Sequence, residues 1–264
     1  MPELLIDGSA APGALWNRGL AYGDGVFETM VHDRGRAPFW PQHRARLLDG
    51  CAALGLAVDS ERAAVEAAGL AGSERCVIRI TVVRAGGRGY FSDPGPHGPA
   101  HRIVSRHPLP ALDPEAGLRV DWARLRLARQ PALAGIKHLN RLEQVLAARE
   151  AAASGCDELL LCDDRGEPVE AISGNLLVYR EGTWWTPEIR TCGVAGVARA
   201  WLLERDGMVN ARSLSAAEID TAEELVIVNS VRGPRPVASL GARSLTARRQ
   251  TLTLRRMFET HRGW

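Results

Sequence analysis

LAGIKHLNRLEQVL, at residues 133–146, is the stretch on which the interpretation of this chain depends. It contains Lys137 just before a pattern that predicts a helix over 140–153, with Leu142, Val145, Leu146 and Ala152 on one side. A lysine between an extended segment and the start of a helix can project into a cleft. We therefore start from this side chain and work outward.

Lys137 is the single lysine among 33 basic residues, and the other 32 are arginines. A coding bias toward arginine explains the excess, but it does not explain why this position kept a lysine. Arginine holds its proton because its pKa lies above ~12, whereas lysine can lose its proton and form a Schiff base. Lys137 is thus either an exposed loop lysine or an amine nucleophile.

Composition excludes several classes of protein. The net charge is +2, and no basic block with interleaved aromatics appears, so we expect no nucleic-acid partner. No apolar stretch reaches 18 residues and the first residues lack a leader pattern, so we expect neither a membrane span nor a signal peptide. Five cysteines without a CxxC pair predict no disulfide framework and no metal site, which favours a cytoplasmic location.

The order of elements predicts an α+β fold in two domains. We expect a smaller α+β domain over 1–107, a proline-rich linker over 108–116 and a larger domain over 117–264. The expected strands are 2–7, 27–32, 76–83, 101–106, 117–127, 157–163, 168–172, 174–179 and 224–229, and the expected helices are 41–56, 60–70, 140–153 and 197–206, with a glycine-rich loop over 85–100.

Pyridoxal phosphate requires a lysine for its aldehyde, a partner for its ring nitrogen and donors for its phosphate. Glu170 is a carboxylate in an apolar strand, which needs a partner: either the ring nitrogen or one of the many arginines. The segment GVAG at 193–196 precedes a helix, where anions bind, although it also fits a simple turn. Arg46 is the candidate cation, and Ser230 offers a hydroxyl.

Several strings extend this pattern in order along the chain: AYGDGVFET at 21–29, GGRGY at 86–90, KHLNRLEQ at 137–144, VEAISGNLL at 169–177, GVAGVAR at 193–199 and IVNS at 227–230. From about residue 5 to residue 235, the chain resembles the 4-amino-4-deoxychorismate lyases. These belong to the fold-type IV pyridoxal-phosphate enzymes, with the branched-chain and D-amino-acid aminotransferases. After about residue 236 no motif matches.

The resemblance implies a two-domain fold-type IV enzyme with its cofactor, pyridoxal 5'-phosphate, in a cleft between the domains. It also implies a homodimer whose partner subunit helps to line the site. Its implied roles are the Schiff-base lysine for Lys137, the acid at the ring nitrogen for Glu170, phosphate binding for Arg46, Gly196, Val197 and Ser230, and substrate binding for Arg88, Tyr90 and Asn140.

The resemblance implies a lyase that converts 4-amino-4-deoxychorismate to 4-aminobenzoate and pyruvate. One alternative is a branched-chain or D-amino-acid aminotransferase, although relatives of that kind usually lack KHLNRLEQ. A second is a binding or regulatory protein without catalysis, against which the intact Lys137 and Glu170 argue. If GGRGY is only a surface loop, another arginine, such as Arg44 or Arg141, has to hold the substrate carboxylate.

Overall fold

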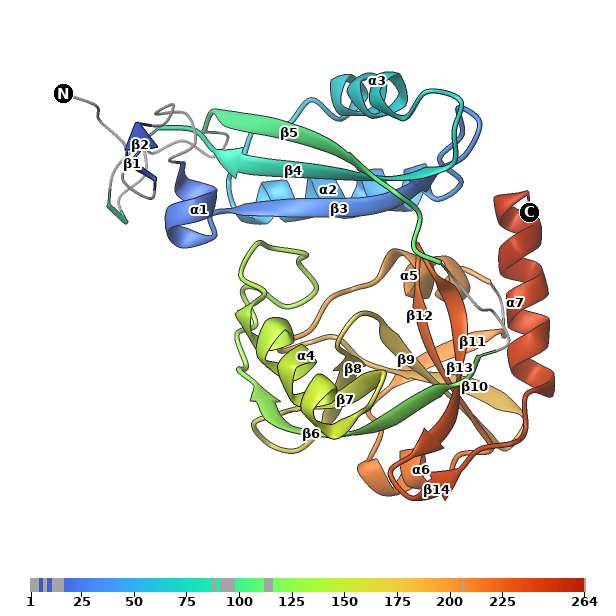
Figure 1. Cartoon of the computed structure of the whole chain (residues 1–264). Coiled ribbons are helices and arrows are strands. Elements are labelled where there is room, and N and C mark those ends of the chain that lie inside the picture. Colours follow the sequence, from blue (N-terminus) through green and yellow to red (C-terminus); the bar gives the residue numbers. More distant parts are fainter. Residues whose placement is uncertain are drawn as a thin grey trace.

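The structure is a computed structural model, and it describes residues 5–6, 9–10, 17–86, 89–90, 98–111, 116–205 and 207–263. Two sheets organise the chain, one above the other in Figure 1. In the described residues, no helix is long and apolar enough to cross a membrane.

The upper layer is an antiparallel three-stranded sheet in the order β3-β4-β5, with two helices packed against it (Figure 1). Alternating and β-branched residues such as those of CVIRITVV favour these strands. Ile78 and Ile80 of the central strand are fully buried and pack with Leu47 of α2 and the small residue Ala63 of α3. The elements are β3 (Gly25–His32), α2 (Trp40–Ala53), α3 (Ser60–Ala71), β4 (Cys76–Arg84) and β5 (Ala100–His107), preceded by β1 (Leu5–Ile6), β2 (Ser9–Ala10) and α1 (Arg18–Tyr22).

The lower layer is a nine-stranded sheet in the order β11-β10-β9-β12-β13-β6-β7-β8, with β14 paired to β13. It is mixed: β6 runs parallel to β7 and β13, and most other pairs are antiparallel. A tight turn at 172–174 brings β8 back beside β9, so the sheet is strongly curled. Its elements are β6 (Leu118–Leu127), α4 (Leu142–Ser154), β7 (Glu158–Asp163), β8 (Pro168–Ala171), β9 (Asn175–Arg180), β10 (Thr183–Pro187), α5 (Val197–Leu203), β11 (Val209–Arg212), α6 (Ala216–Asp220), β12 (Glu224–Asn229), β13 (Gly233–Leu240), β14 (Arg243–Ser244) and α7 (Arg249–Arg262).

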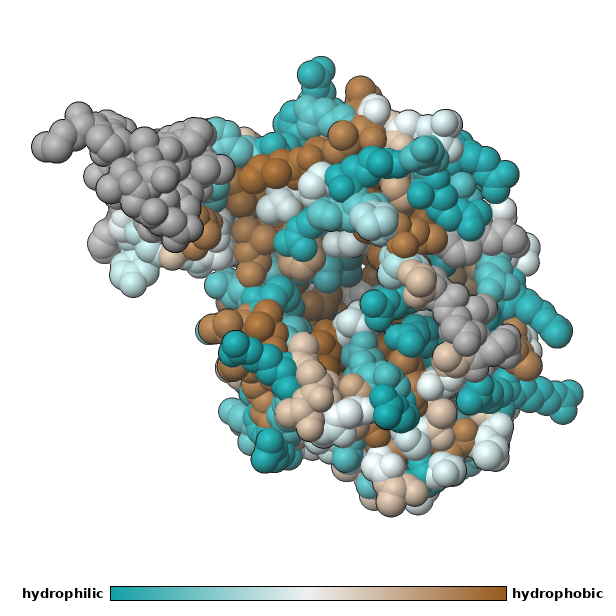
Figure 2. All heavy atoms as spheres, in the orientation of Figure 1, coloured by the Kyte–Doolittle hydropathy of each residue, from teal (hydrophilic) through white to brown (hydrophobic). Residues whose placement is uncertain are grey.

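Helix α4 forms where expected, but the apolar side that the sequence pattern showed is not the side that packs against the sheet. Leu142, Val145 and Leu146 are 69, 50 and 44% exposed, whereas Ala147 and Ala151 are buried in the core with β6 and β7. The small alanine side chains let the helix lie close to the sheet, so the leucines are left on the outer side. Figure 2 shows brown, hydrophobic spheres on this flank of the molecule.

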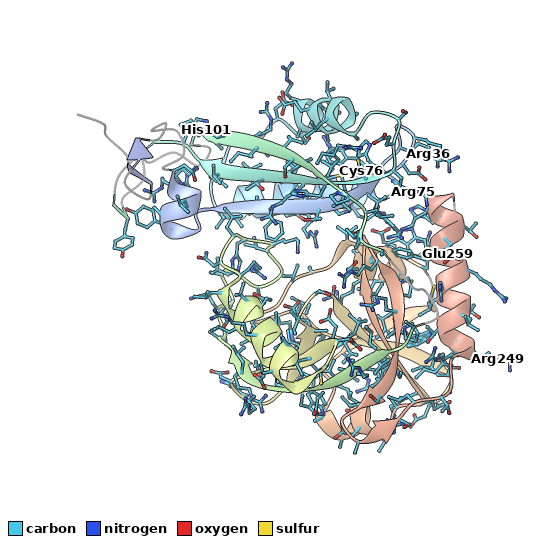
Figure 3. All side chains as sticks on the ribbon, in the orientation of Figure 1. Arg36, Arg75, Cys76, His101, Arg249 and Glu259 are labelled. Atoms are coloured by element: carbon cyan, nitrogen blue, oxygen red, sulfur yellow. The ribbon has the colours of Figure 1, made fainter. Side chains whose placement is uncertain are left out.

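Helix α7 accounts for part of the C-terminal segment that carries no motif. Phe258 of this helix is buried, and its ring lies 4.8 Å from that of Phe39, just before α2. Arg262, near the end of the helix, donates a hydrogen bond to the backbone carbonyl of Ser230. The helix therefore joins the upper layer to the lower one and supports the end of β12; Figure 3 shows its residue Glu259 on the side of the molecule where Arg36 and Arg75 of the upper layer lie.

The expected fold class is confirmed, and the expected strands and helices that lie in described residues are present with shifted ends. The sequence interpretation missed α1, α6, α7, β2, β10, β11, β13 and β14. The domain boundary stays a prediction, since residues 112–115 of the proposed linker lie outside the described residues.

Candidate active site

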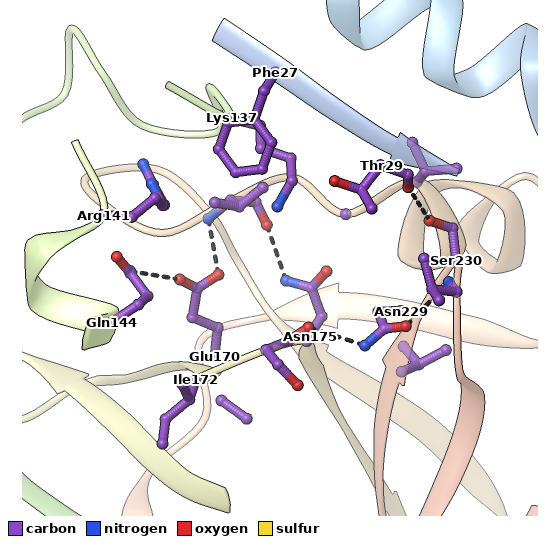
Figure 4. Close-up of a pocket in the computed structure, with 18 of the residues that line it drawn as sticks. Phe27, Thr29, Lys137, Arg141, Gln144, Glu170, Ile172, Asn175, Asn229 and Ser230 are labelled. Carbon is purple, nitrogen blue, oxygen red and sulfur yellow. Dashed lines mark hydrogen bonds between the residues drawn. The ribbon is translucent and has the colours of Figure 1, made fainter. Parts of the chain in front are cut away.

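A cavity of about 410 Å³ lies between the two layers, and both contribute to its walls. Phe27 and Thr29 of β3 and Arg46 of α2 come from the upper layer. The lower layer supplies Lys137, Glu170 and the segments around β9, α5 and the end of β12. Figure 4 shows Lys137 and Glu170 facing each other across this space.

The backbone around Lys137 is fixed by hydrogen bonds to the start of β3. The Lys137 carbonyl accepts from the Phe27 N–H at 2.9 Å, and the Leu139 N–H donates to the Gly25 carbonyl, also at 2.9 Å. Gly25 has no room for a side chain, since an added Cβ would lie 2.4 Å from the Val82 carbonyl oxygen. The lysine is therefore presented from a segment that the upper sheet holds in place.

The Lys137 amine lies 4.5 Å from the centre of the Phe27 ring. Burial lowers its pKa to about 8, and the positive charges of Arg46 and Arg141 act in the same direction, against the opposing effect of the acids Glu28 and Glu170. A substantial fraction of the amine is therefore neutral near physiological pH, as a nucleophile or base requires.

Glu170 lies in β8 and is 5% exposed. One carboxylate oxygen accepts the Val194 N–H at 2.9 Å, and the other lies 3.5 Å from the Gln144 amide nitrogen. Burial raises the pKa of Glu170, and these hydrogen bonds, together with Arg141 and Lys137, only partly offset that effect. The site thus favours a further hydrogen-bond donor or cation beside this carboxylate.

Arg46 is held by Glu28, a residue of β3 that the sequence interpretation did not single out. The guanidinium donates from Nε at 2.8 Å and from Nη2 at 2.6 Å to the two oxygens of Glu28, and from Nη1 at 3.0 Å to the Ala195 carbonyl. His43 lies 2.6 Å from the same carboxylate. Burial would raise the pKa of Glu28, but Arg46 and His43 outweigh burial and hold it at about 2. This ionised acid fixes the arginine at the cavity wall.

The predicted phosphate-binding residues Arg46, Gly196, Val197 and Ser230 all line the cavity, and Figure 4 shows Ser230 on the side opposite Arg141. Gly196 precedes α5, which Val197 begins, and Asn175 donates to the Val194 carbonyl at 2.9 Å. A Cβ on Gly196 would lie 1.9 Å from the Asn175 Oδ1, so a larger residue there would have to displace the Asn175 side chain. Ser230 Oγ donates to the Thr29 carbonyl at 3.3 Å, which ties this end of the cavity to β3.

Neither of the two predicted substrate-binding residues that the structure describes, Tyr90 and Asn140, lines this cavity. Tyr90 is 85% exposed and its ring lies 5.5 Å from that of Tyr22. Asn140 lies against Gly23, to whose carbonyl its amide donates at 3.4 Å, and it lines a smaller neighbouring cavity. Arg88 lies outside the described residues. The substrate roles of all three stay predictions.

Among the residues to which the prediction assigned no role, Thr29, Arg141, Gln144 and Asn175 also line the cavity. Each lies in a quoted string, AYGDGVFET, KHLNRLEQ or VEAISGNLL. The strings alone could therefore have identified these residues as candidates for the site. Their contacts depend on how distant segments meet, which the strings do not contain.

These groups match what pyridoxal phosphate requires. A buried, partly neutral amine and a buried carboxylate face each other. This arrangement suits pyridoxal phosphate, because its aldehyde and its ring nitrogen lie on opposite sides of the pyridine ring. The glycine start of α5 and the Arg46 guanidinium offer donors to the same cavity, which Ser230 also lines. The cavity volume also suits a ligand of this size.

Comparisons with known proteins agree with this chemistry. The sequence model of the amino-transferase class IV family matches residues 25–240. An aminodeoxychorismate lyase of Vibrio harveyi is 32% identical over 238 residues, which cover 86% of this chain and 87% of the relative. The crystal structure of 4-amino-4-deoxychorismate lyase from Pseudomonas aeruginosa superposes with a TM-score of 0.87 and 38% identity, covering 97% of this chain and 98% of that one.

A branched-chain aminotransferase from Thermoproteus uzoniensis, whose structure was determined with norvaline, superposes with a TM-score of 0.85. The superposition covers 99% of this chain and 93% of that one, at 21% identity. At that identity the likeness shows the shared fold alone.

The pKa of Lys137 provides a direct test of the site. Because the chain has one lysine, reductive methylation with ¹³C-formaldehyde labels only Lys137 and the N-terminal amine. We expect the labelled lysine to titrate near pH 8 by NMR in the cofactor-free protein, because burial and two arginines disfavour its charged form. In the urea-unfolded control it returns to ~10.4. Titration near that ordinary value in the folded protein would contradict the site as described.

Proposed function

The chain belongs to the amino-transferase class IV family, and from that premise we propose that it is a pyridoxal-phosphate-dependent lyase. It converts 4-amino-4-deoxychorismate to 4-aminobenzoate and pyruvate. The aminodeoxychorismate lyases of Vibrio harveyi and Pseudomonas aeruginosa, at 32 and 38% identity over most of the chain, support this activity.

One observation carries the proposal: the only lysine of the chain faces a buried carboxylate across a cavity between the two layers. A surface lysine would keep an ordinary pKa, and a structural Glu170 would be paired with one of the many arginines. Instead, no arginine in the described residues lies within ion-pair distance of Glu170, whose hydrogen bonds come from Val194 and Gln144.

In this assignment, Lys137 carries the cofactor, Glu170 holds its ring nitrogen, and Arg46, Gly196, Val197 and Ser230 hold its phosphate. Bound pyridoxal phosphate supplies an electron-withdrawing ring that stabilises negative charge on the carbon next to the reacting nitrogen. Glu28 acts indirectly, since it fixes the Arg46 guanidinium and leaves N–H groups of that side chain for the phosphate.

Lys137 and Glu170 act on two different protons. The Lys137 amine, once released by the substrate amine, accepts the proton from the substrate carbon that bears the nitrogen, because its lowered pKa keeps it neutral often enough to act as a base. Glu170 keeps a proton at the ring nitrogen, because a buried carboxylate is stable only beside a donor or cation. Loss of pyruvate then leaves an aromatic product.

The rival within the same fold is an aminotransferase for branched-chain or D-amino acids. Such an enzyme uses the same cofactor groups, so the cavity alone does not separate the two. The string KHLNRLEQ and the higher identity to the lyases than to the aminotransferase of the same fold favour the lyase.

Product analysis tests the proposed reaction. We expect the cofactor-loaded protein to release pyruvate and 4-aminobenzoate in equal amounts from 4-amino-4-deoxychorismate, with no keto-acid acceptor added. Turnover of leucine or D-alanine that depends on 2-oxoglutarate, without pyruvate release from the chorismate derivative, would make it an aminotransferase instead.

Glu170→Gln tests the role of the carboxylate. We expect this variant to bind the cofactor and to release pyruvate about 100- to 1000-fold more slowly, because an amide does not hold the ring nitrogen protonated; removal of one preorganised electrostatic group costs ~3–4 kcal/mol. Glu167→Gln, an exposed acid on the turn before β8, is the matched control and should turn over normally. Equal rates for the two variants would make Glu170 a structural residue.

The exposed face of α4 supports a homodimer as the functional unit. Leu142, Val145 and Leu146 are exposed, and Val145 also lines the cavity, so a second copy seated on this face would lie at the edge of the site. Twofold dimers are the commonest oligomers. The five cysteines are all free, which fits the cytoplasmic location that we propose for this dimer.

Charge placed on this helix should separate the subunits. We expect the double variant Leu142→Glu, Leu146→Glu to change a dimer into a monomer in light scattering at micromolar concentration, since like charges would face each other across the interface. Val65→Glu, on an exposed position of α3, is the control and should leave the dimer intact. A wild-type protein that is monomeric under these conditions would refute the proposed dimer.

A further inference from the structure

Two arginines line the cavity, and their surroundings differ. The Arg46 guanidinium is neutralised by Glu28 through two short hydrogen bonds. Arg141, at the residue before α4, has no ion pair with an acid anywhere in the described part of the chain. Burial lowers its pKa, although Glu170 and Glu143 oppose that effect from a distance. A partly buried charge without a carboxylate is costly unless a ligand supplies one.

His138 holds Arg141 in one orientation. The guanidinium donates from Nε to the His138 backbone carbonyl at 3.0 Å, and its Nη2 lies 2.7 Å from the His138 Nε2. A guanidinium can only donate, so His138 Nε2 must accept and the imidazole must be neutral, with its proton on Nδ1. Burial and Arg141 lower the pKa of His138 to about 4, in keeping with that state.

The remaining nitrogen, Nη1, makes no hydrogen bond within the described residues, so the arginine has donors to spare. Figure 4 places Arg141 beside Gln144 and Glu170, on the side of the cavity opposite Ser230. Gln144 also has a buried amide oxygen without a partner among the described residues. Arg141 and Gln144 therefore offer polar groups that have no role in the proposed binding of the phosphate.

We propose that Arg141, oriented by His138, binds a carboxylate of the substrate. The inference rests on the proposed function, whose substrate carries two carboxylates that take no part in attachment to the cofactor. Arginine suits this role because its fork matches a carboxylate with two parallel hydrogen bonds. His138 is a positioning residue: it fixes the plane of the guanidinium and leaves its outer edge for the ligand.

Carboxylic acids compared with their own amides test the proposal through binding measurements, without catalysis. Calorimetry with the cofactor-loaded protein compares 4-aminobenzoate with 4-aminobenzamide, and pyruvate with pyruvamide, so that each substrate carboxylate has its own probe. We expect wild type to prefer at least one acid over its amide. Arg141→Gln should weaken that acid about ten- to a hundredfold and leave the amide unchanged, in keeping with a charge-assisted hydrogen bond.

Three further variants separate orientation from general structure. His138→Gln keeps an acceptor for Arg141 and should retain most of the acid preference, whereas His138→Leu removes the acceptor and should lose it, with KM raised more than kcat is lowered. Arg149→Gln removes a charge from an exposed position of α4 and should behave as wild type. Arg141→Lys should recover only part of the affinity, because an ammonium lacks the fork.

The two proposals fail in different ways. Equal weakening of acid and amide by Arg141→Gln, or no preference for either acid in wild type, would overturn the role of Arg141 even if the protein releases pyruvate. An acid preference that depends on Arg141, in a protein that releases no pyruvate, would keep the carboxylate site and overturn the lyase.

Discussion

Burial of the Lys137 amine against the Phe27 ring is the interaction on which the rest of the site depends. An amine in water is largely protonated near neutral pH, and the protonated form does not attack an aldehyde. The protein therefore has to lower the pKa of this amine while keeping the side chain buried. The backbone hydrogen bonds from β3 to residues 137 and 139 fix the segment, and the positive charges of Arg46 and Arg141 add to the effect of burial. The acids near the amine limit the shift, and the pKa stays at about 8.

The other charged groups of the cavity are also buried, and each needs a hydrogen-bond or ion-pair partner. Glu28 neutralises Arg46, His43 packs on Glu28, and the Val194 N–H satisfies one oxygen of Glu170. The upper layer supplies the Glu28–Arg46 pair and the lower layer supplies Lys137 and Glu170, so the cavity is complete only when both layers meet. Packing of Phe39 on Phe258 of α7 helps to hold the layers in that relation. Stability and chemistry thus share the same contacts.

Part of this arrangement could be predicted from the sequence, where a residue type was unusual for its context. Lys137 was visible as the single lysine, Glu170 as a carboxylate in an apolar strand, and the glycines before α5 as a close approach of backbone. Glu28 and the contact of Asn175 with Gly196 were not predicted, since both depend on segments far apart in sequence. Periodicity showed that one face of α4 is apolar, but it does not show what covers that face; here Ala147 and Ala151, on another face, pack inward.

The central claim is that this one amine carries the cofactor, and a chain with a single lysine allows that claim to be tested directly. The protein is incubated with pyridoxal phosphate, reduced with borohydride, digested and mapped by mass spectrometry. Since Lys137 is the only lysine, the account predicts the reduced phosphopyridoxyl group on the peptide that contains residue 137, with loss of the label in Lys137→Ala. A label on the N-terminal amine alone, or no label in a folded protein, would contradict it.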